Sequence, residues 1–583
     1  MTTNDPTMSL TTATKIYYGM PNFAGAAMGI AVSIHINIFY SDVVMIPLGF
    51  IALAVALARA FDAISDPLMG WVTDRTRTRW GRRRPWIAIG APLQAAALVA
   101  LFSPPESFTI PQLSVWFTLC FICYYLTHTI LAIPHYALGP ELTGDYKERS
   151  SLFAWLEGFT LLGVIYASGV PRLVTQRIFG ELLGFTIFAI ITGVLLIILY
   201  WLLVYKLREK PEYSAKPPNP LAPGIRRTMR NRPFRILMVS TLIGSLTAGI
   251  PGYLMPFFVI YVLKPPDPQN WVPWMLMVVF ISSAVTLPLW LKLANAVGKL
   301  RALITARFLA IGTFFSFFLM GEGDIWYYAV FVGLAGAANG ATQFLGLAIQ
   351  ADVIDYDELL TGHRREAQYQ SLWAIMTKFT MIPSAAVPLA VLAAMGYAPN
   401  IDQNETVIFT ITALYGLSTA VSSALALVVL LWFPISETMH RSIQAAIKKI
   451  KLGETVIDPL TGKEISPHGE REVDEDTGWH LDHFSLRELA RAQKRGQGTL
   501  VHSTGLAVLL SLGLGLITCW AAVISLGDLS SPPGLTAVLL IVMTGICATA
   551  LCYHALRLAA ARRLTVQPVH ETLISKHLAT LTT

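Results

Sequence analysis

Residues 59–86 read RAFDAISDPLMGWVTDRTRTRWGRRRPW, an apolar stretch that holds two acidic residues and then runs into a strongly basic loop. Asp62 and Asp66 are four residues apart, so a helix places both carboxylates on one face, one turn from each other. Ionised carboxylates inside a membrane are unfavourable unless another group neutralises them. A transported cation is the simplest such group. Ser65 and Thr129 add hydroxyl oxygens, which hard cations accept as ligands.

The composition supports a membrane location for this stretch. Of the 583 residues, 54% are hydrophobic and only 14% are charged, whereas soluble domains carry about 25% charged residues. The chain is therefore an all-α, polytopic integral membrane protein by class. Its net charge of +7 is concentrated in short loops, as the positive-inside rule requires, and does not indicate a nucleic-acid partner.

Fourteen apolar runs approach or exceed the length of about 20 residues that crosses a bilayer. They lie near residues 18–40, 43–72, 85–104, 112–139, 150–170, 184–205, 235–263, 272–294, 302–320, 325–351, 370–396, 406–433, 503–527 and 533–556. The loops 74–85 and 206–234 are rich in arginine and lysine and fall on the same side of the membrane. This bias predicts a multi-pass protein with both termini in the cytoplasm. The expected location is the plasma membrane, which in a bacterium is the inner membrane.

A long loop rich in proline and basic residues separates six spans from the next six. Faint internal repeats on either side of it are typical of secondary transporters, whose binding site lies between the repeats. The predicted organisation is an N-terminal six-helix bundle (1–205), a cytoplasmic linker (206–234), a second six-helix bundle (235–434), a cytoplasmic segment (435–500), and two additional spans with a tail (501–583).

Lys378 and Arg59 are the candidates for balancing charge at the predicted cation site. Lys378 is the only lysine deep within a span of the second half. The charges of Asp62, Asp66, Lys378 and one monovalent cation sum to zero, so loss of the cation should lead one aspartate to take up a proton. Arg59, three residues before Asp62, leaves a purely structural alternative open, in which it neutralises the pair by itself.

Other polar residues inside the spans are candidates for a substrate cavity. They are Glu157, His35, Asn37, His128 and Gln343. A single histidine in a membrane span is also commonly a hydrogen-bonded packing residue, so that alternative stays open for His35 and His128. Charged residues at the predicted cytoplasmic helix ends are candidates for gating ion pairs between the bundles, with simple topological charges as the alternative. They are Asp74, Arg75 and Arg149 in the first half, and Asp355 and Glu358 in the second.

Three strings of sequence give the chain a family resemblance. The first is the stretch at 59–86; the others are PHYALGPELTGDYKER at 134–149 and ADVIDYDELLTGHR at 351–364. In order and spacing they resemble the glycoside–pentoside–hexuronide:cation symporters, the melibiose permease group of the major facilitator superfamily. The resemblance implies a fold of two six-helix bundles with alternating access, to which this chain adds two C-terminal spans. It also implies coupling to Na⁺, H⁺ or Li⁺.

Carried over residue by residue, the resemblance places Asp62, Asp66, Ser65 and Thr129 on the family's cation site, with Lys378 close to it. The family's sugar-binding acids do not carry over, because Ala26 and Ala132 stand at two of those places and Glu157 replaces an arginine. Galactoside recognition of the family's kind is therefore not expected here.

The sequence accordingly predicts Na⁺- or H⁺-coupled symport of a sugar, glycoside or related small organic solute. Two alternatives stay open: a coupled carrier of an amphipathic, lipid- or steroid-like solute, and a non-transporting membrane sensor or assembly protein. An enzyme is not expected, because no His-x-x-x-His, Gly-x-Ser-x-Gly or phosphate-loop pattern is present. The expected partners are a small-molecule substrate, a monovalent cation and the lipid bilayer. We expect a monomer with no cofactor except the coupling ion, and no metal other than transported Na⁺.

Overall fold

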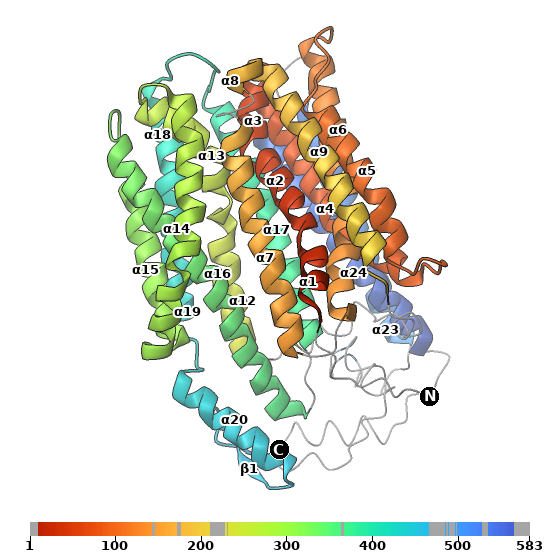
Figure 1. The fold of residues 1–583 in the computed structure, drawn as a ribbon. Helices are drawn as coiled ribbons and strands as arrows, with labels where there is room; N and C mark the ends of the chain where they lie inside the picture. The colour runs from red at the N-terminus through yellow and green to blue at the C-terminus, as the bar shows by residue number, and fades with distance from the viewer. Residues whose placement is uncertain are drawn as a thin grey trace.

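The computed structural model describes residues 10–142, 146–171, 176–209, 228–229, 231–362, 366–465, 484, 488, 492, 496, 498–526 and 535–564. Nearly all of this part of the chain is helical, and the long helices run roughly side by side (Figure 1). Helices of this length and apolarity hydrogen-bond their own backbone, which is what a spanning segment needs inside a bilayer.

The first half of the fold occupies residues 12–206. Its first span is broken into short pieces: α1 (Thr12–Gly19), α2 (Pro21–Ile30), η1 (Ala31–His35), α3 (Ile36–Ile38) and η2 (Phe39–Val43). The following elements are α4 (Leu48–Arg75), α5 (Arg84–Leu101), α6 (Ile110–Leu142), α7 (Tyr146–Val170), α8 (Gln176–Phe179) and α9 (Glu181–Lys206).

The second half occupies residues 232–430 and also begins with a broken span. That span consists of α12 (Arg232–Ala248), α13 (Ile250–Phe257) and η4 (Phe258–Leu263). It is followed by α14 (Pro268–Val297), α15 (Lys299–Phe318), α16 (Ile325–Thr361), α17 (Glu366–Ala394), α18 (Glu405–Thr412), η5 (Ala413–Leu417) and α19 (Ser418–Leu430). After the second half come α20 (Glu437–Lys451), the short antiparallel strands β1 (Val456–Ile457) and β2 (Glu464–Ile465), α23 (Gly498–Leu526) and α24 (Leu535–Leu564).

The predicted spans agree with helices in the structure, and most boundaries lie within a few residues. Within the part of the chain that the structure describes, 11 helices are long and apolar enough to cross a membrane. The other three predicted spans correspond to α4, α17 and α24, which are helical but are not among these 11 helices. The fold class is as predicted, and the count of fourteen spans is not confirmed.

The first spans of the two halves share an unusual feature. Each ends in π-helical turns, η2 in the first half and η4 in the second. Such turns widen a helix locally and occur frequently at functional sites. The two spans also meet, because α13 packs against η1 and α3. The halves also touch where α17 packs on α4 and where α14 packs on α7.

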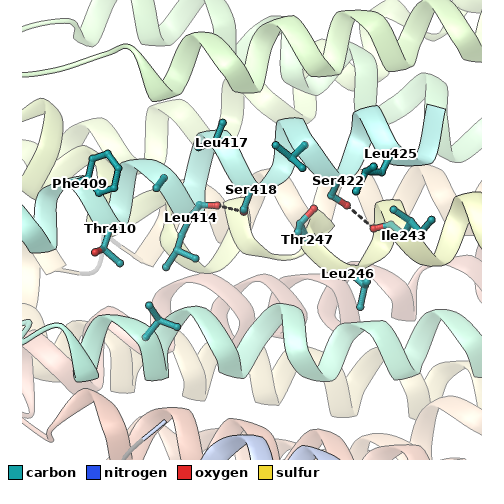
Figure 2. A pocket seen from close by; sticks show the side chains of 13 residues that line it. Ile243, Leu246, Thr247, Phe409, Thr410, Leu414, Leu417, Ser418, Ser422 and Leu425 are labelled. Atoms are coloured by element: carbon teal, nitrogen blue, oxygen red, sulfur yellow. Dashed lines mark hydrogen bonds between the residues drawn. The ribbon is translucent and has the colours of Figure 1, made fainter. Parts of the chain in front are cut away.

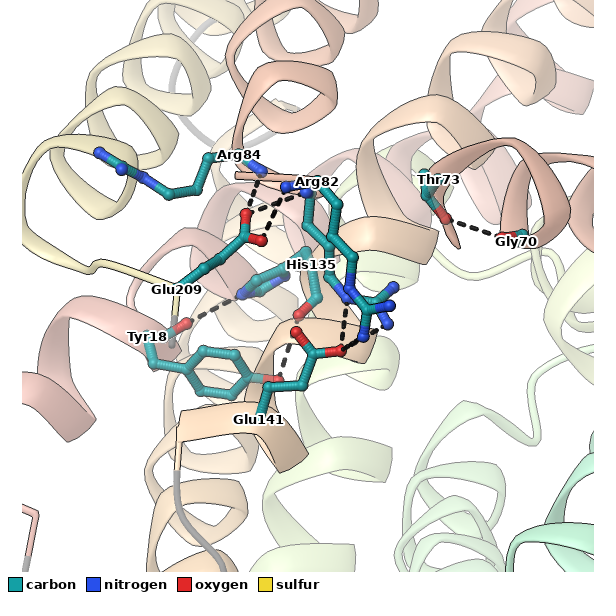
Figure 3. Close-up of polar contacts among 9 residues, drawn as sticks. Tyr18, Gly70, Thr73, Arg82, Arg84, His135, Glu141 and Glu209 are labelled. Atoms are coloured by element: carbon teal, nitrogen blue, oxygen red, sulfur yellow. Dashed lines mark hydrogen bonds and ion pairs between the residues drawn. The ribbon is translucent and has the colours of Figure 1, made fainter. Parts of the chain in front are cut away.

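The basic loop between α4 and α5 is fixed by Glu209 (Figure 3). Glu209, just after α9, accepts hydrogen bonds from the backbone N–H groups of Arg82, Arg83 and Arg84 at 2.8–2.9 Å. Gly81 has φ +106°, and a Cβ there would lie 2.5 Å from the Glu209 carboxyl carbon. Only glycine fits both requirements without strain. The arginine cluster therefore has a structural role as well as a topological one.

Candidate functional site

The predicted cation-site residues come together where α4 packs on α6. The Thr129 hydroxyl on α6 donates to Asp66 Oδ1 at 2.8 Å and lies 3.4 Å from Asp62 Oδ1. Ser65 Oγ is 3.2 Å from Thr129 Oγ1. Asp62 is buried and Asp66 is partly exposed. The arrangement gathers two carboxylates and two hydroxyls, an all-oxygen set of the kind that hard monovalent cations and protons use.

Arg59, one turn before Asp62, lies between the two halves of the fold. Its Nη2 atom donates to the Tyr253 hydroxyl of α13 at 2.7 Å. Its guanidinium carbon is 4.7 Å from the centre of the Tyr125 ring on α6, a cation–π geometry. Arg59 thus connects the helix that carries the carboxylates to the opposite half. The side chain of Lys378 lies outside the described residues, although its helix, α17, packs on α4.

The predicted cavity residues divide into two groups. Glu157 and Gln343 are exposed, and the His128 ring stacks on Tyr124. His35 and Asn37 are fully buried and contact backbone carbonyls of the first half: His35 Nε2 is 3.1 Å from the Ala167 oxygen, and Asn37 Nδ2 is 3.5 Å from the Ser33 oxygen. In this conformation His35 and Asn37 are therefore packing residues.

Three polar residues near Glu157 were not predicted from the sequence as site residues. Asn22 Nδ2 donates to the Thr160 hydroxyl at 3.2 Å and lies 3.5 Å from the Tyr136 hydroxyl. Tyr136 is 48% exposed, and Glu157 lies one turn before Thr160 on α7. Tyr136 follows Thr129 by seven residues, which puts both side chains on the same face of α6. That spacing was the available signal, and the four residues form a polar patch that lies two helical turns, roughly 10 Å, along α6 from Thr129.

The structure describes the side chains of only two of the predicted gating residues, Asp355 and Glu358. The side chains of Asp74, Arg75 and Arg149 lie outside the described residues. Asp355 and Glu358, at the end of α16, contact α20: Asp355 Oδ2 is 2.9 Å from His440 Nε2, and Glu358 Oε1 is 2.7 Å from Lys451 Nζ. These pairs attach α20 to the second half.

A cross-half polar cluster lies at the opposite end of the molecule, at Asp42 in η2. Tyr261 of η4 donates to Asp42 Oδ2 at 2.6 Å, and Tyr397, after α17, donates to Oδ1 at 2.7 Å. The Asn400 side chain donates to the Asp42 carbonyl at 2.7 Å. Burial, and then the Asp42 charge, raise the pKa of Tyr397 well above its ordinary value, so the phenol stays protonated and keeps donating. This Asp42 cluster fastens the two halves together at that end.

Replacing Asp42 with Asn should loosen this end of the protein. Asparagine keeps one of the two acceptor oxygens, and a hydrogen bond to a charged group contributes about 1.5–3 kcal/mol. Loss of one such bond should raise the ratio of open to closed conformations at least about tenfold. Spin labels at Glu106→Cys and Glu322→Cys, on exposed loops of the two halves, should report longer distances. Asp402→Asn is the matched control, because Asp402 pairs at 3.1 Å with Lys264 on the surface. Unchanged distances in the Asp42→Asn protein would show that the cluster does not hold the halves closed.

The structure also contains an apolar groove of about 540 Å³ in the second half (Figure 2). It lies between α12, α17 and the span formed by α18, η5 and α19. Its lining includes the exposed side chains of Leu246, Phe409 and Leu425 and none of the carboxylates described above. The groove therefore opens outward from the bundle and is separate from the Asp62–Asp66 pair.

Comparison with known proteins agrees with the fold. Residues 17–437 match the family described as MFS/sugar transport protein. The inner membrane symporter YicJ of Escherichia coli (strain K12) is 26% identical over 429 residues, which cover 71% of this chain and 90% of the relative. The putative glycoside/cation symporter YagG of the same organism is 24% identical over 462 residues, covering 78% of this chain and 98% of the relative.

Among solved structures, a D-xylose-proton symporter superposes with a TM-score of 0.52 at 13% identity, covering 72% of this chain and 97% of that one. At this identity the likeness concerns the fold alone. The family match spans both halves of the fold, including the helices that carry the carboxylate pair. The chain is therefore a membrane transporter rather than an enzyme, and it belongs to the MFS/sugar transport protein family.

Proposed function

We propose that this protein is a symporter in which a monovalent cation binds at Asp62, Asp66, Ser65 and Thr129 and drives the uptake of a sugar or glycoside. The observation that carries the proposal is the convergence of the Thr129 hydroxyl on both carboxylates, at 2.8 and 3.4 Å. A cation placed there becomes the positive partner of the two acids, and the Thr129 hydroxyl rotates to present its oxygen to the cation. Without Na⁺, a proton on one aspartate serves the same purpose.

Coupling follows from the position of α4 between the halves. Arg59 reaches Tyr253 of the second half from a position one turn before Asp62. A change in the charge of the carboxylate pair therefore alters the field acting on a contact that crosses the interface. By linkage, a cation that favours one arrangement of the halves raises the affinity for a substrate that favours the same arrangement, and the substrate raises the cation affinity by the same factor.

The polar patch formed by Asn22, Tyr136, Glu157 and Thr160 supports a polyhydroxylated substrate. Amide, hydroxyl and carboxylate groups in this set donate to and accept from sugar hydroxyls, and an exposed tyrosine ring offers a flat face for a sugar ring. Relatives named as glycoside and glucuronide carriers point the same way. The patch favours a sugar or glycoside over the amphipathic solute that the sequence also allowed.

The proposed location is the bacterial inner membrane, with both termini in the cytoplasm and the Asp42 cluster at the opposite, periplasmic end. In that orientation the cluster closes the periplasmic side in the conformation described. The proposed functional unit is a monomer, because all the groups named above come from one chain.

The proposal is tested by uptake into proteoliposomes with imposed Na⁺ or H⁺ gradients. A panel of radiolabelled pentosides, glucosides and uronides should contain at least one compound that accumulates when a gradient is present. Accumulation should stop when an ionophore collapses the gradient. Uptake that proceeds equally with and without both gradients would mean facilitated diffusion and would contradict the proposal.

A further inference from the structure

Helices α23 and α24 lie outside residues 17–437, the part that matches the transporter family. They form a tight antiparallel hairpin. The Thr544 hydroxyl of α24 donates to the Thr518 hydroxyl of α23 at 2.9 Å, and a Cβ added at Gly515 would lie 3.4 Å from Cys547 Cβ. Small residues and hydroxyl contacts of this kind are typical of closely packed membrane helices.

Within the transporter, α24 packs against α4 of the first half and α17 of the second (Figure 1). These two helices also pack on each other, so α24 lies across the seam between the halves. Val538 and Ile541 of α24 are buried in the same apolar cluster as the core of the first half. The hairpin is thus an integral part of the bundle.

The contact with α4 falls at the depth of the carboxylate pair. A Cβ added at Gly545 would lie 3.0 Å from the Cβ of Ala60, so glycine is what allows the helices to come this close. Ala60 is one residue after Arg59 and two before Asp62. Two residues correspond to roughly 200° around a helix, so α24 supports α4 from the side opposite Asp62.

The far end of α24 is anchored by a charged contact. Arg557, which is buried, pairs with Glu488 at 2.8 Å, and its guanidinium lies 5.6 Å from the centre of the Phe484 ring. Both partners belong to the segment that connects α20 to α23. This anchor fixes the position of α24 along its own axis, which sets the residue that faces Ala60.

We propose that the α23–α24 hairpin braces α4, and that Gly545 is a positioning residue for the proposed cation site. The close contact at Ala60 holds α4 against α6, and this keeps Asp62 and Asp66 within reach of Thr129. A bulkier residue at 545 pushes α4 away from its position and separates the carboxylates from the hydroxyl. The inference rests on the proposed function, since it concerns the cation that this site binds.

The test is the half-saturating Na⁺ or H⁺ concentration for thermal stabilisation of the purified full-length protein. Overpacking at Gly545→Leu should raise that concentration about tenfold, the equivalent of about 1.4 kcal/mol. The matched control is Gly513→Leu on α23, where an added Cβ meets nothing within 4 Å; it should leave the cation response unchanged.

A rescue experiment separates positioning from general destabilisation. Gly545→Ala should weaken the cation response mildly, and combining it with Ala60→Gly should restore the response by removing the opposing Cβ. If Gly545 had a purely structural role, its substitution would lower the melting temperature equally with and without cation and would leave the half-saturating cation concentration unchanged. That result, or a double variant that stays impaired, would overturn the brace while leaving the proposed function intact. A wild-type protein with no response to either cation would overturn both.

Discussion

Asp66→Asn is expected to abolish cation-driven accumulation of substrate. Asparagine keeps the size of the side chain and one oxygen, but it removes the charge that a cation needs and adds an N–H₂ donor facing the site. Because affinity for hard cations depends on the number of ligand charges, we expect the cation affinity to fall by about 100-fold or more, which corresponds to about 2.8 kcal/mol. Radiolabelled uptake under an imposed gradient measures the effect.

The same variant should retain a partial activity. Exchange of internal for external substrate needs no net cation movement, so counterflow should persist in the Asp66→Asn protein if the halves still rock. Asp402→Asn, which removes a carboxylate with a 91% exposed side chain, is the control for surface charge and should behave like wild type. An Asp66→Asn protein that accumulates substrate with the wild-type dependence on cation would contradict the assigned role of Asp66.

Glu141→Gln is expected to produce the largest loss of stability. Glu141 and Arg83 are both buried, and Glu141 Oε1 lies 2.6 Å from Arg83 Nη2 and 2.5 Å from Arg82 Nη2 (Figure 3). Removing one partner of a buried ion pair typically costs about 3–5 kcal/mol, because charge remains where water does not reach. The melting temperature in detergent, together with the yield of folded protein, reports the change.

A surface pair provides the comparison for this experiment. Glu437 and Arg441 are one turn apart on α20 and pair at 2.5 Å, with side chains 42% and 75% exposed. Such pairs contribute only about 0.3–0.5 kcal/mol, so Glu437→Gln should change the melting temperature little. If Glu141→Gln and Glu437→Gln lowered the melting temperature equally, the buried ion pair would contribute no more to stability than the exposed one.

Features set by local sequence were predictable. The spacing of Asp62 and Asp66 places them on one helical face whatever the rest of the fold does, and apolar runs of sufficient length located the helices to within a few residues in most cases. The family resemblance then brought Thr129 to the same site, and the structure places its hydroxyl between the two acids. Whether a cation binds there remains a prediction.

Features that depend on distant pairing were not predictable. No local pattern marks Asp42 as a residue that joins the halves, since its partners Tyr261 and Tyr397 lie 219 and 355 residues further along the chain. Those tyrosines resemble ordinary core aromatics in sequence. His35 shows the opposite case, because its polarity suggested a cavity, while the direction of its side chain is set by the packing of the first span on α7 and was not encoded in any local pattern.

Thermal stability as a function of Na⁺ concentration and pH shows whether a cation binds between Asp62 and Asp66. A ligand that binds only the folded state at 100 times its Kd stabilises by about 2.7 kcal/mol. We expect Na⁺, or protons as the pH falls, to raise the melting temperature of the wild-type protein, and the Asp62→Asn/Asp66→Asn variant to lose this response. A double variant that responds to both cations as the wild type does would show that the cation binds elsewhere.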